Sequence, residues 1–107
     1  MEQEIMQLIT YGGDARSKAL LALKEIANNN FAEAEELLQQ ANENIITAHK
    51  VQTQLLQQEA SGEGQTVQLL MVHAQDHLMD AMVIYDLTKQ ILVLQKNNLE
   101  LINSLKK

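Results

Sequence analysis

The stretch LMVHAQDHLMD, residues 70–80, carries the side chains whose types and spacing could do chemistry. His73, Asp76, His77 and Asp80 stand among leucine, methionine, valine and alanine, at positions i, i+3, i+4 and i+7. Residues three and four apart are neighbours on a helix, so the four side chains share one stretch of surface. Because burying a charge is costly unless it is paired, this concentration of polar groups in an apolar setting needs a reason.

Four interpretations fit this cluster. The histidines could be buried and hydrogen-bonded to the carboxylates as a purely structural network. Imidazole and carboxylate together could bind zinc, iron or manganese. A histidine could act as a general base oriented by an aspartate, although no serine or threonine is placed locally as a nucleophile. Finally, an exposed neutral imidazole could accept a phosphoryl group and pass it on to a second partner. The residues alone leave the structural and phosphocarrier interpretations open.

The elements that position the cluster are helices. Apolar residues recur in steps of three and four, which predicts helices over about residues 2–28, 31–58 and 66–104. The chain of 107 residues fits one domain, 1–107, and its lack of proline permits long helices. We therefore expect an all-α, antiparallel three-helix bundle.

The breaks between the helices carry turn signals. Asn28-Asn29-Asn30 ends the first helix, with Asn30 as N-cap of the second and Glu33 completing a capping box. Residues 61–64, SGEG, form the second break. The first helix is expected to continue through Gly12-Gly13, because its apolar stripe keeps phase there and a packed glycine allows close backbone approach. The alternative is a break, with Asp14 as a new N-cap.

The third helix has two apolar stripes, roughly 140° apart at 100° per residue. One stripe can pack in the bundle and contains Val67, Met71, Ala74, Leu78, Ala81, Met82 and Tyr85. The other, called the outer stripe below, contains Leu69, His73, Asp76, Asp80, Val83, Leu87, Ile91 and Leu94. A helix that is apolar on two sides needs a second partner, so the outer stripe predicts an interface between subunits.

Composition excludes several kinds of site. There is no cysteine, which rules out disulfides, thiolate metal sites and cysteine nucleophiles. The net charge is −6, from 8 basic and 14 acidic side chains without a basic stripe, which disfavours nucleic-acid binding. The N-terminus lacks the pattern of a signal peptide, and no apolar run is long enough to span a membrane. We expect a cytoplasmic protein without direct membrane insertion.

MVHAQDHLM, residues 71–79, resembles the signature of the lactose/cellobiose-type enzyme IIA family of the bacterial phosphoenolpyruvate-dependent sugar phosphotransferase system. Other segments resemble family motifs in the same order and spacing: GDARS from Gly13, Ala48-His49 with Gln52-Thr53, and EASGE from Glu59. Together they cover essentially the whole chain. Asp80 departs from the small or hydroxyl residue expected after HAQDHLM.

The resemblance implies a homotrimer of three-helix subunits that acts as a phosphotransferase component through a phosphohistidine intermediate. It implies that His73 is phosphorylated at Nε2 by the histidine-containing phosphocarrier protein and passes the group to a cysteine of the cognate enzyme IIB. The pathway would take up a β-linked disaccharide of the cellobiose, chitobiose or lactose type. Asp76 from each subunit would meet at the threefold axis around one shared Mg²⁺. A hard cation would relieve the repulsion among the three carboxylates.

Other polar residues receive weaker assignments. His77 would either support the phosphoryl group through a hydrogen bond or line the groove. His49 is expected to pack within the second helix, and Gln75 to lie at a rim or partner contact. Arg16 would pair with a carboxylate or face the phosphoryl group, and Asp80 would be exposed or hydrogen-bonded. The alternative function is a non-catalytic helical assembly protein whose interface is held by a metal.

Overall fold

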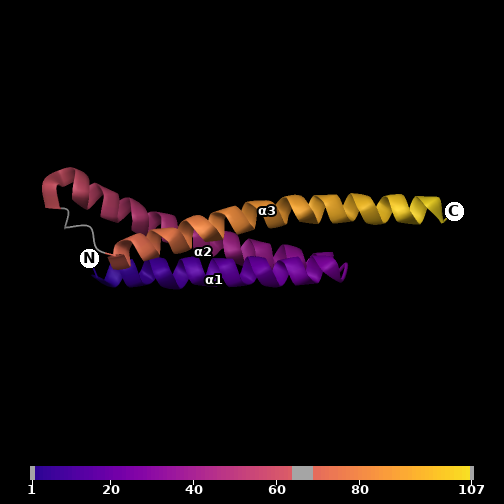
Figure 1. Ribbon diagram of the computed structural model, residues 1–107, viewed down its shortest axis with the longest axis horizontal. Coiled ribbons are helices and arrows are strands. Elements are labelled where there is room, and N and C mark those ends of the chain that lie inside the picture. The colour runs from indigo at the N-terminus through magenta and orange to yellow at the C-terminus, as the bar shows by residue number, and fades with distance from the viewer. Residues whose placement is uncertain (1, 64–68, 107) are drawn as a thin grey trace.

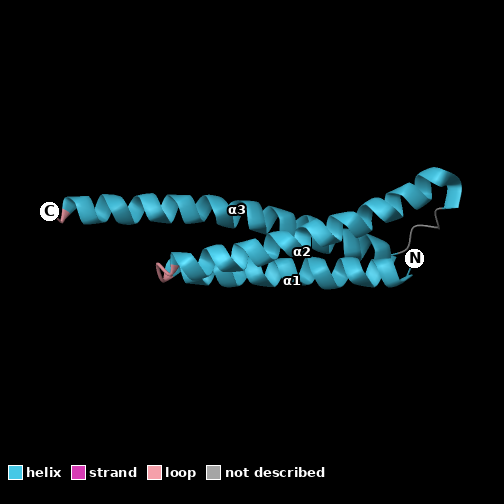
Figure 2. Cartoon of the chain, turned by 180° about the vertical axis from the view of Figure 1, so that it is seen from behind, coloured by secondary structure: helices cyan, strands magenta, loops and turns pink. Residues whose placement is uncertain are grey.

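The protein is a bundle of long helices. The computed structural model describes residues 2–63 and 69–106, which form α1 (Glu2–Ala27), α2 (Phe31–Gln58), a π-helical turn (Glu59–Glu63) and α3 (Leu69–Leu105). No strand occurs within these ranges (Figure 2). Successive helices run in opposite directions, and the molecule measures 66 × 20 × 19 Å (Figure 1). The expected all-α antiparallel bundle is confirmed.

The helix boundaries agree closely with the expected ones. The first helix ends one residue earlier than expected, the second has the expected bounds and the third ends one residue later. The expected start of the third helix at Thr66 lies outside the described residues. After α2, the chain breaks at Gly62, whose φ of 84° belongs to the left-handed region that glycine adopts without steric cost.

The turn between α1 and α2 is made by asparagines, through backbone hydrogen bonds. The amide of Asn30 donates to the carbonyl of Glu25 at 2.8 Å, and the amide of Asn29 donates to that of Ile26 at 3.0 Å. Asn29 takes the left-handed conformation, with a φ of 62°. This pattern is the Schellman motif, in which asparagine commonly replaces glycine.

The expected capping box at Asn30 is wrong. Asn30 is the N-cap residue of α2 by position, but its side chain makes no capping hydrogen bond. Its Nδ2 instead donates to Oε2 of Glu25 at 2.9 Å, back toward the helix that has just ended. The tight Schellman turn keeps Asn30 close to the end of α1, so the amide finds a carboxylate there.

The core follows the expected stripes. The larger buried cluster consists of Ile5, Leu8, Ala15, Ala41, Ile45, Ala48, Val51, Leu55, Ala74, Leu78 and Ala81. A second cluster, toward the α1–α2 turn, consists of Ala22, Ile26, Ala34, Leu38 and Leu92. Many of these side chains are alanines, and small side chains at the contact allow closely spaced helix axes.

Gly12 lies on the packed face of α1, and the helix continues through it as expected. A Cβ at this position would stand 3.2 Å from both the carbonyl carbon of His77 and the amide nitrogen of Leu78. The backbone of α1 therefore presses directly against the backbone of α3. This contact lies within residues 70–80, called the histidine segment below, so it fixes the distance between that segment and α1.

Candidate functional site

The side chains of His73 and His77 contact each other one turn apart on α3. Their Nε2 atoms lie 3.0 Å apart, and their rings meet edge to face, with centroids 4.5 Å apart and planes at 83°. His73 is exposed and His77 is half-buried. One Nε2 must carry a proton and the other a lone pair for this hydrogen bond to form. The two imidazoles therefore act as one unit.

His77 has a second notable atom. Its Nδ1 is buried, and it has no hydrogen-bond partner among the described residues. If His77 carries its proton on Nε2 and donates it to His73, this bare Nδ1 is an acceptor. The Nε2 of His73 is then unprotonated, which is the state that a nucleophilic imidazole requires.

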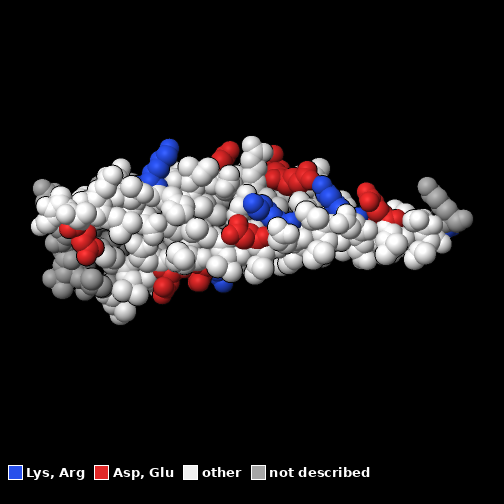
Figure 3. Space-filling model, turned by 90° about the horizontal axis from the view of Figure 1, so that it is seen from above, with Lys and Arg blue, Asp and Glu red and all other residues white. Residues whose placement is uncertain are grey.

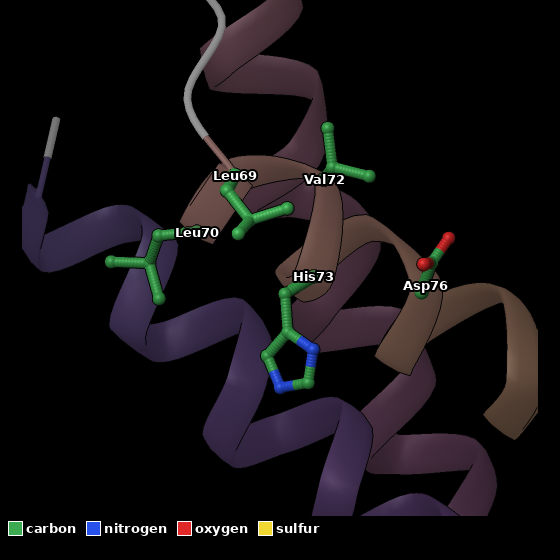
Figure 4. Close-up of a pocket in the computed structure, with 5 residues that line it drawn as sticks. All are labelled: Leu69, Leu70, Val72, His73 and Asp76. Carbon is green, nitrogen blue, oxygen red and sulfur yellow. The ribbon is translucent and has the colours of Figure 1, made fainter.

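An open hollow adjoins His73 on the surface of α3. It has a volume of ≈ 460 Å³ and is lined by Leu69, Leu70, Val72, His73 and Asp76. Figure 4 shows the imidazole of His73 and the carboxylate of Asp76 pointing in different directions from the same helix. Asp76 makes no hydrogen bond to either imidazole in the described part of the chain. It therefore does not orient a histidine base within one subunit.

Two of the apolar residues beside His73 belong to neither predicted stripe of the third helix. Leu70 and Val72 line the hollow, and they are 39 % and 44 % exposed. The signal for Val72 was its spacing, since it lies three residues after Leu69 and four before Asp76. The hollow therefore combines one exposed imidazole with an apolar wall.

Gln75 does more than lie at a rim. It is half-buried, and its Oε1 accepts a hydrogen bond from Nε2 of Gln52 on α2. This bond ties α2 to the same turn of α3 that carries the histidines. The sequence marks Gln52 only as part of a motif, because pairing between distant helices leaves no local signal.

The expectation that His49 packs within the bundle is wrong. His49 is exposed and lines a separate surface hollow on α2 with Ile46, Lys50, Thr53 and Gln54. It stands at the flank of the buried stripe of α2. It directly follows the buried Ala48 and so lies about 100° around the helix from that packed position. Its place in a family motif therefore has no packing explanation within one subunit.

Arg16 and Asp80 are both exposed, which settles the choice left open for Asp80. Arg16 forms no ion pair with any described residue. On the face seen in Figure 3, acidic and basic side chains are interspersed along the molecule.

One subunit does not build a metal centre in the ranges described here. No group of three or more His, Cys, Asp or Glu side chains among residues 2–63 and 69–106 is arranged to hold a metal ion. As placed, His73, Asp76, His77 and Asp80 do not form a self-contained metal site. Asp76 could act as a ligand only together with groups from other chains.

The outer stripe of α3 is uncovered along its whole length. All eight of its residues are exposed, including Leu69 at 85 %, Leu87 at 58 % and Leu94 at 66 %. The stripe that faces the bundle is buried or half-buried wherever it is described. No described helix is long and apolar enough to cross a membrane. The outer stripe is thus exposed surface without a partner among residues 2–63 and 69–106, as the double periodicity predicted.

Comparisons with known proteins agree on one family. Residues 3–96 match the family described as PTS system, lactose/cellobiose-specific IIA subunit. The chain is 47% identical to the lactose-specific EIIA component of Staphylococcus epidermidis over 90 residues, which are 84% of this chain and 86% of that protein. The crystal structure of the cellobiose-specific enzyme IIA of Bacillus anthracis superposes with a TM-score of 0.86 at 43% identity, covering 90% of this chain and 88% of that one.

A third comparison includes a partner protein. The IIA component for chitobiose from Escherichia coli, solved in complex with HPr, superposes with a TM-score of 0.77 at 36% identity. The match covers 90% of this chain and 93% of that one. The similarity therefore spans the histidine segment and all three helices.

Proposed function

This chain belongs to the lactose/cellobiose-specific IIA family of the sugar phosphotransferase system, and we propose that it is a phosphocarrier acting through His73. The observation that carries the proposal is the exposed imidazole of His73, with its Nε2 3.0 Å from that of His77. It borders an open hollow rather than a closed pocket. Such a site suits a group that two proteins must reach in turn.

The reaction at His73 is a phosphoryl exchange between nitrogen atoms. The lone pair of His73 Nε2 attacks phosphorus while the bond from phosphorus to the donor's histidine nitrogen breaks, and that electron pair returns to the donor ring. The second exchange passes the group to a sulfur atom of the acceptor and frees Nε2 again. Neither step consumes a further reactant, so the site needs positioning and charge stabilisation rather than a bound substrate.

His77 would support this exchange through its Nε2–H. The hydrogen bond to His73 must open as phosphorus approaches, because both compete for the same lone pair. The released N–H then lies one helical turn from the transferred group and can donate to a phosphoryl oxygen. A hydrogen bond to a charged oxygen is stronger than one to a neutral acceptor, so it stabilises the phosphorylated state.

The partners follow from the family. The donor is the histidine-containing phosphocarrier protein, supported by the similar chitobiose IIA component solved with HPr. The acceptor is a cysteine of the cognate enzyme IIB, which matches the absence of cysteine in this chain. The named relatives handle lactose, cellobiose and chitobiose, so we propose uptake of a β-linked disaccharide, with this component in the cytoplasm.

The assembly would be a homotrimer in which the apolar residues of three outer stripes meet, while His73, about 60° around α3 from Asp76, borders the groove between subunits. Covering these exposed leucines and valines on copies of α3 removes apolar surface from water, the main driving force for such association. The stripe also brings Asp76 of each copy toward the axis. Three carboxylates supply only oxygen ligands, which fits a hard cation such as Mg²⁺. When bound, the ion would neutralise charge at the axis, while His73 performs the transfer.

The deciding experiment is phosphotransfer from phosphoenolpyruvate through enzyme I and the phosphocarrier protein. We expect an acid-labile phosphoryl group on His73, mapped by mass spectrometry at neutral or basic pH and discharged by enzyme IIB. His73→Gln should remain folded and unlabelled, because His73 is exposed and supports no core contact. His49→Gln, at another exposed histidine, should be labelled normally. An unlabelled but folded protein with active partners would instead favour the non-catalytic assembly protein.

A further inference from the structure

The C-terminal end of α3 extends beyond the rest of the bundle. The last polar links to the rest of the bundle are the hydrogen bond from Gln95 Nε2 to Asn29 Oδ1 in the α1–α2 turn, at 2.9 Å, and the ion pair of Lys96 with Glu35 on α2. Figure 1 shows the end of α3 without a neighbouring helix, and residues 100–106 are all exposed. A lone helical segment this short is marginal in water. Its retention in the helix points to a partner.

This overhang continues the outer stripe with a strict seven-residue repeat. From Leu87 onward the exposed residues on this side fall in steps of four and three: Leu87, Ile91, Leu94, Asn98, Leu101 and Leu105. Written as a heptad, they occupy d, a, d, a, d and a. This is the pattern of a left-handed coiled-coil seam. Leu101 and Leu105 are 59 % and 79 % exposed, so nothing in the described chain fills the other side of the seam.

The charges beside the seam indicate that the partner is another copy of this chain. The flanking e and g positions along the exposed part are uncharged, namely Gln90, Gln95, Asn97, Ile102 and Ser104. Lys89, Lys96, Glu100 and Lys106 fall at the outer b, c and f positions. Identical helices packed in parallel face each other with identical flanks, so neutral flanks avoid like-charge repulsion. A charged partner would find no complementary charge there.

Asn98 is the one polar residue in this part of the seam. We propose that Asn98 forms a polar layer between copies of α3 that fixes parallel, in-register assembly. Its amide can both donate and accept, so Asn98 side chains at one level can bond to each other. A slip by one heptad would place each amide against Ile91 or Leu105 of another copy and leave it without a partner.

The consequence reaches the histidine segment. This inference rests on the proposed trimer, whose Asp76 carboxylates must stand at one level to share a cation. A slip of seven residues would displace them by about 10 Å along the axis, at 1.5 Å per residue. It would also move each His73 relative to its neighbouring subunit. Asn98 would thus fix the alignment of the helices at Asp76, which lies 22 residues earlier in α3.

The test compares Asn98→Leu with Asn103→Leu. Both asparagines are exposed on the overhang, but Asn103 lies about 140° from Asn98 around the helix, away from the seam. Sedimentation equilibrium gives the stoichiometry and the concentration of half-dissociation. A nitroxide on Lys106→Cys gives distances between copies, and the chain has no other cysteine to label.

The parent and Asn103→Leu should give one stoichiometry and one narrow distance. Asn98→Leu should half-dissociate at a concentration lower by on the order of tenfold, since a buried asparagine costs stability. It should also show additional oligomers or longer distances. If the parent is a trimer but Asn98→Leu has the same stoichiometry and distances as Asn103→Leu, or dissociates, the proposed role of Asn98 in fixing the register is overturned and the trimer is not. A monomeric parent would overturn the trimer as well, whereas the phosphocarrier chemistry is judged separately by labelling.

Discussion

At the scale of single residues, the bond between His73 and His77 links the protonation of two imidazoles. The residue that donates must hold its proton on Nε2, and the other must present a lone pair there. If the phosphoryl group binds Nε2 of His73, His77 must hold its proton on Nε2 before the attack, so that Nε2 of His73 carries the lone pair. The half-buried position of His77 then keeps its N–H close to the phosphorylated nitrogen.

Replacing His77 tests whether its N–H assists the transferred group. His77→Leu removes the donor and should slow single-turnover phosphotransfer to His73 by about 10–100-fold, the equivalent of one charge-assisted hydrogen bond. His77→Gln keeps an N–H of similar reach and should recover part of that rate. Rapid-quench kinetics would measure both, with circular dichroism as the control for folding. Equal rates for the two variants would show that His77 only lines the groove.

The sequence could predict contacts between residues close together in the chain, but not those that depend on tertiary packing. The i, i+4 spacing correctly predicted that His73 and His77 are neighbours, but not that their Nε2 atoms meet, because side-chain torsions are set by packing. His49 was misjudged for a related reason, since it lies at the flank of the buried stripe of α2, where the width of the packed face decides exposure. The side chain of Asn30 was misjudged because a carboxylate on the preceding helix competes for it.

At the scale of helices, Gly12 and Gly13 are neighbours in sequence with opposite surroundings. Gly12 has the backbone of α3 at 3.2 Å from where a Cβ would lie, whereas a Cβ on Gly13 would have no atom within 4 Å. Periodicity predicted this division, because the apolar stripe passes through Gly12 alone of the two. It also predicted the helix boundaries to within about one residue wherever they are described.

Alanine at each glycine should therefore have opposite effects on stability. Gly13→Ala should raise the free energy of unfolding by about 0.5–1 kcal/mol, because alanine restricts the unfolded chain and favours helix. Gly12→Ala has the same helix gain but forces two rigid backbones apart, an overpacking cost of about 1–3 kcal/mol. We expect a net loss of stability and slower phosphotransfer, since α3 shifts at His77. Urea unfolding would measure both variants, and equal stabilisation would refute the close approach.

At the scale of the whole molecule, the outer stripe of α3 is the surface that one subunit leaves exposed and an assembly would cover. The double periodicity of the third helix predicted that this stripe would stay uncovered, and its eight exposed residues confirm that much. The periodicity could not give the number of subunits, because an apolar stripe predicts that a partner covers it but not how many copies take part. The family supplies the proposed trimer, and the neutral flanks of the seam support identical partners.

If Asp76 holds a metal ion at the axis, a chelator should lower the stability of the trimer, and this effect should require Asp76. With three Asp76 carboxylates together, removing the cation restores their repulsion, so the trimer should melt at lower temperature in EDTA than in excess Mg²⁺. A ligand at a hundredfold excess over its Kd stabilises the folded assembly by about 2.7 kcal/mol. Asp76→Leu should stay trimeric and lose this dependence, because apolar replacement of buried charge is often neutral or stabilising.

Asp80→Leu is the matched control, since it removes the same charge from the same exposed stripe one turn further along α3. Scanning calorimetry of the three proteins, with and without chelator, should show a shift for the parent and for Asp80→Leu but none for Asp76→Leu. If Asp76→Leu dissociates into monomers, the Asp76 carboxylates stabilise the trimer, and their mutual repulsion is not the dominant effect. If the parent ignores the chelator, Asp76 binds no cation, and protons must relieve the repulsion at the axis instead.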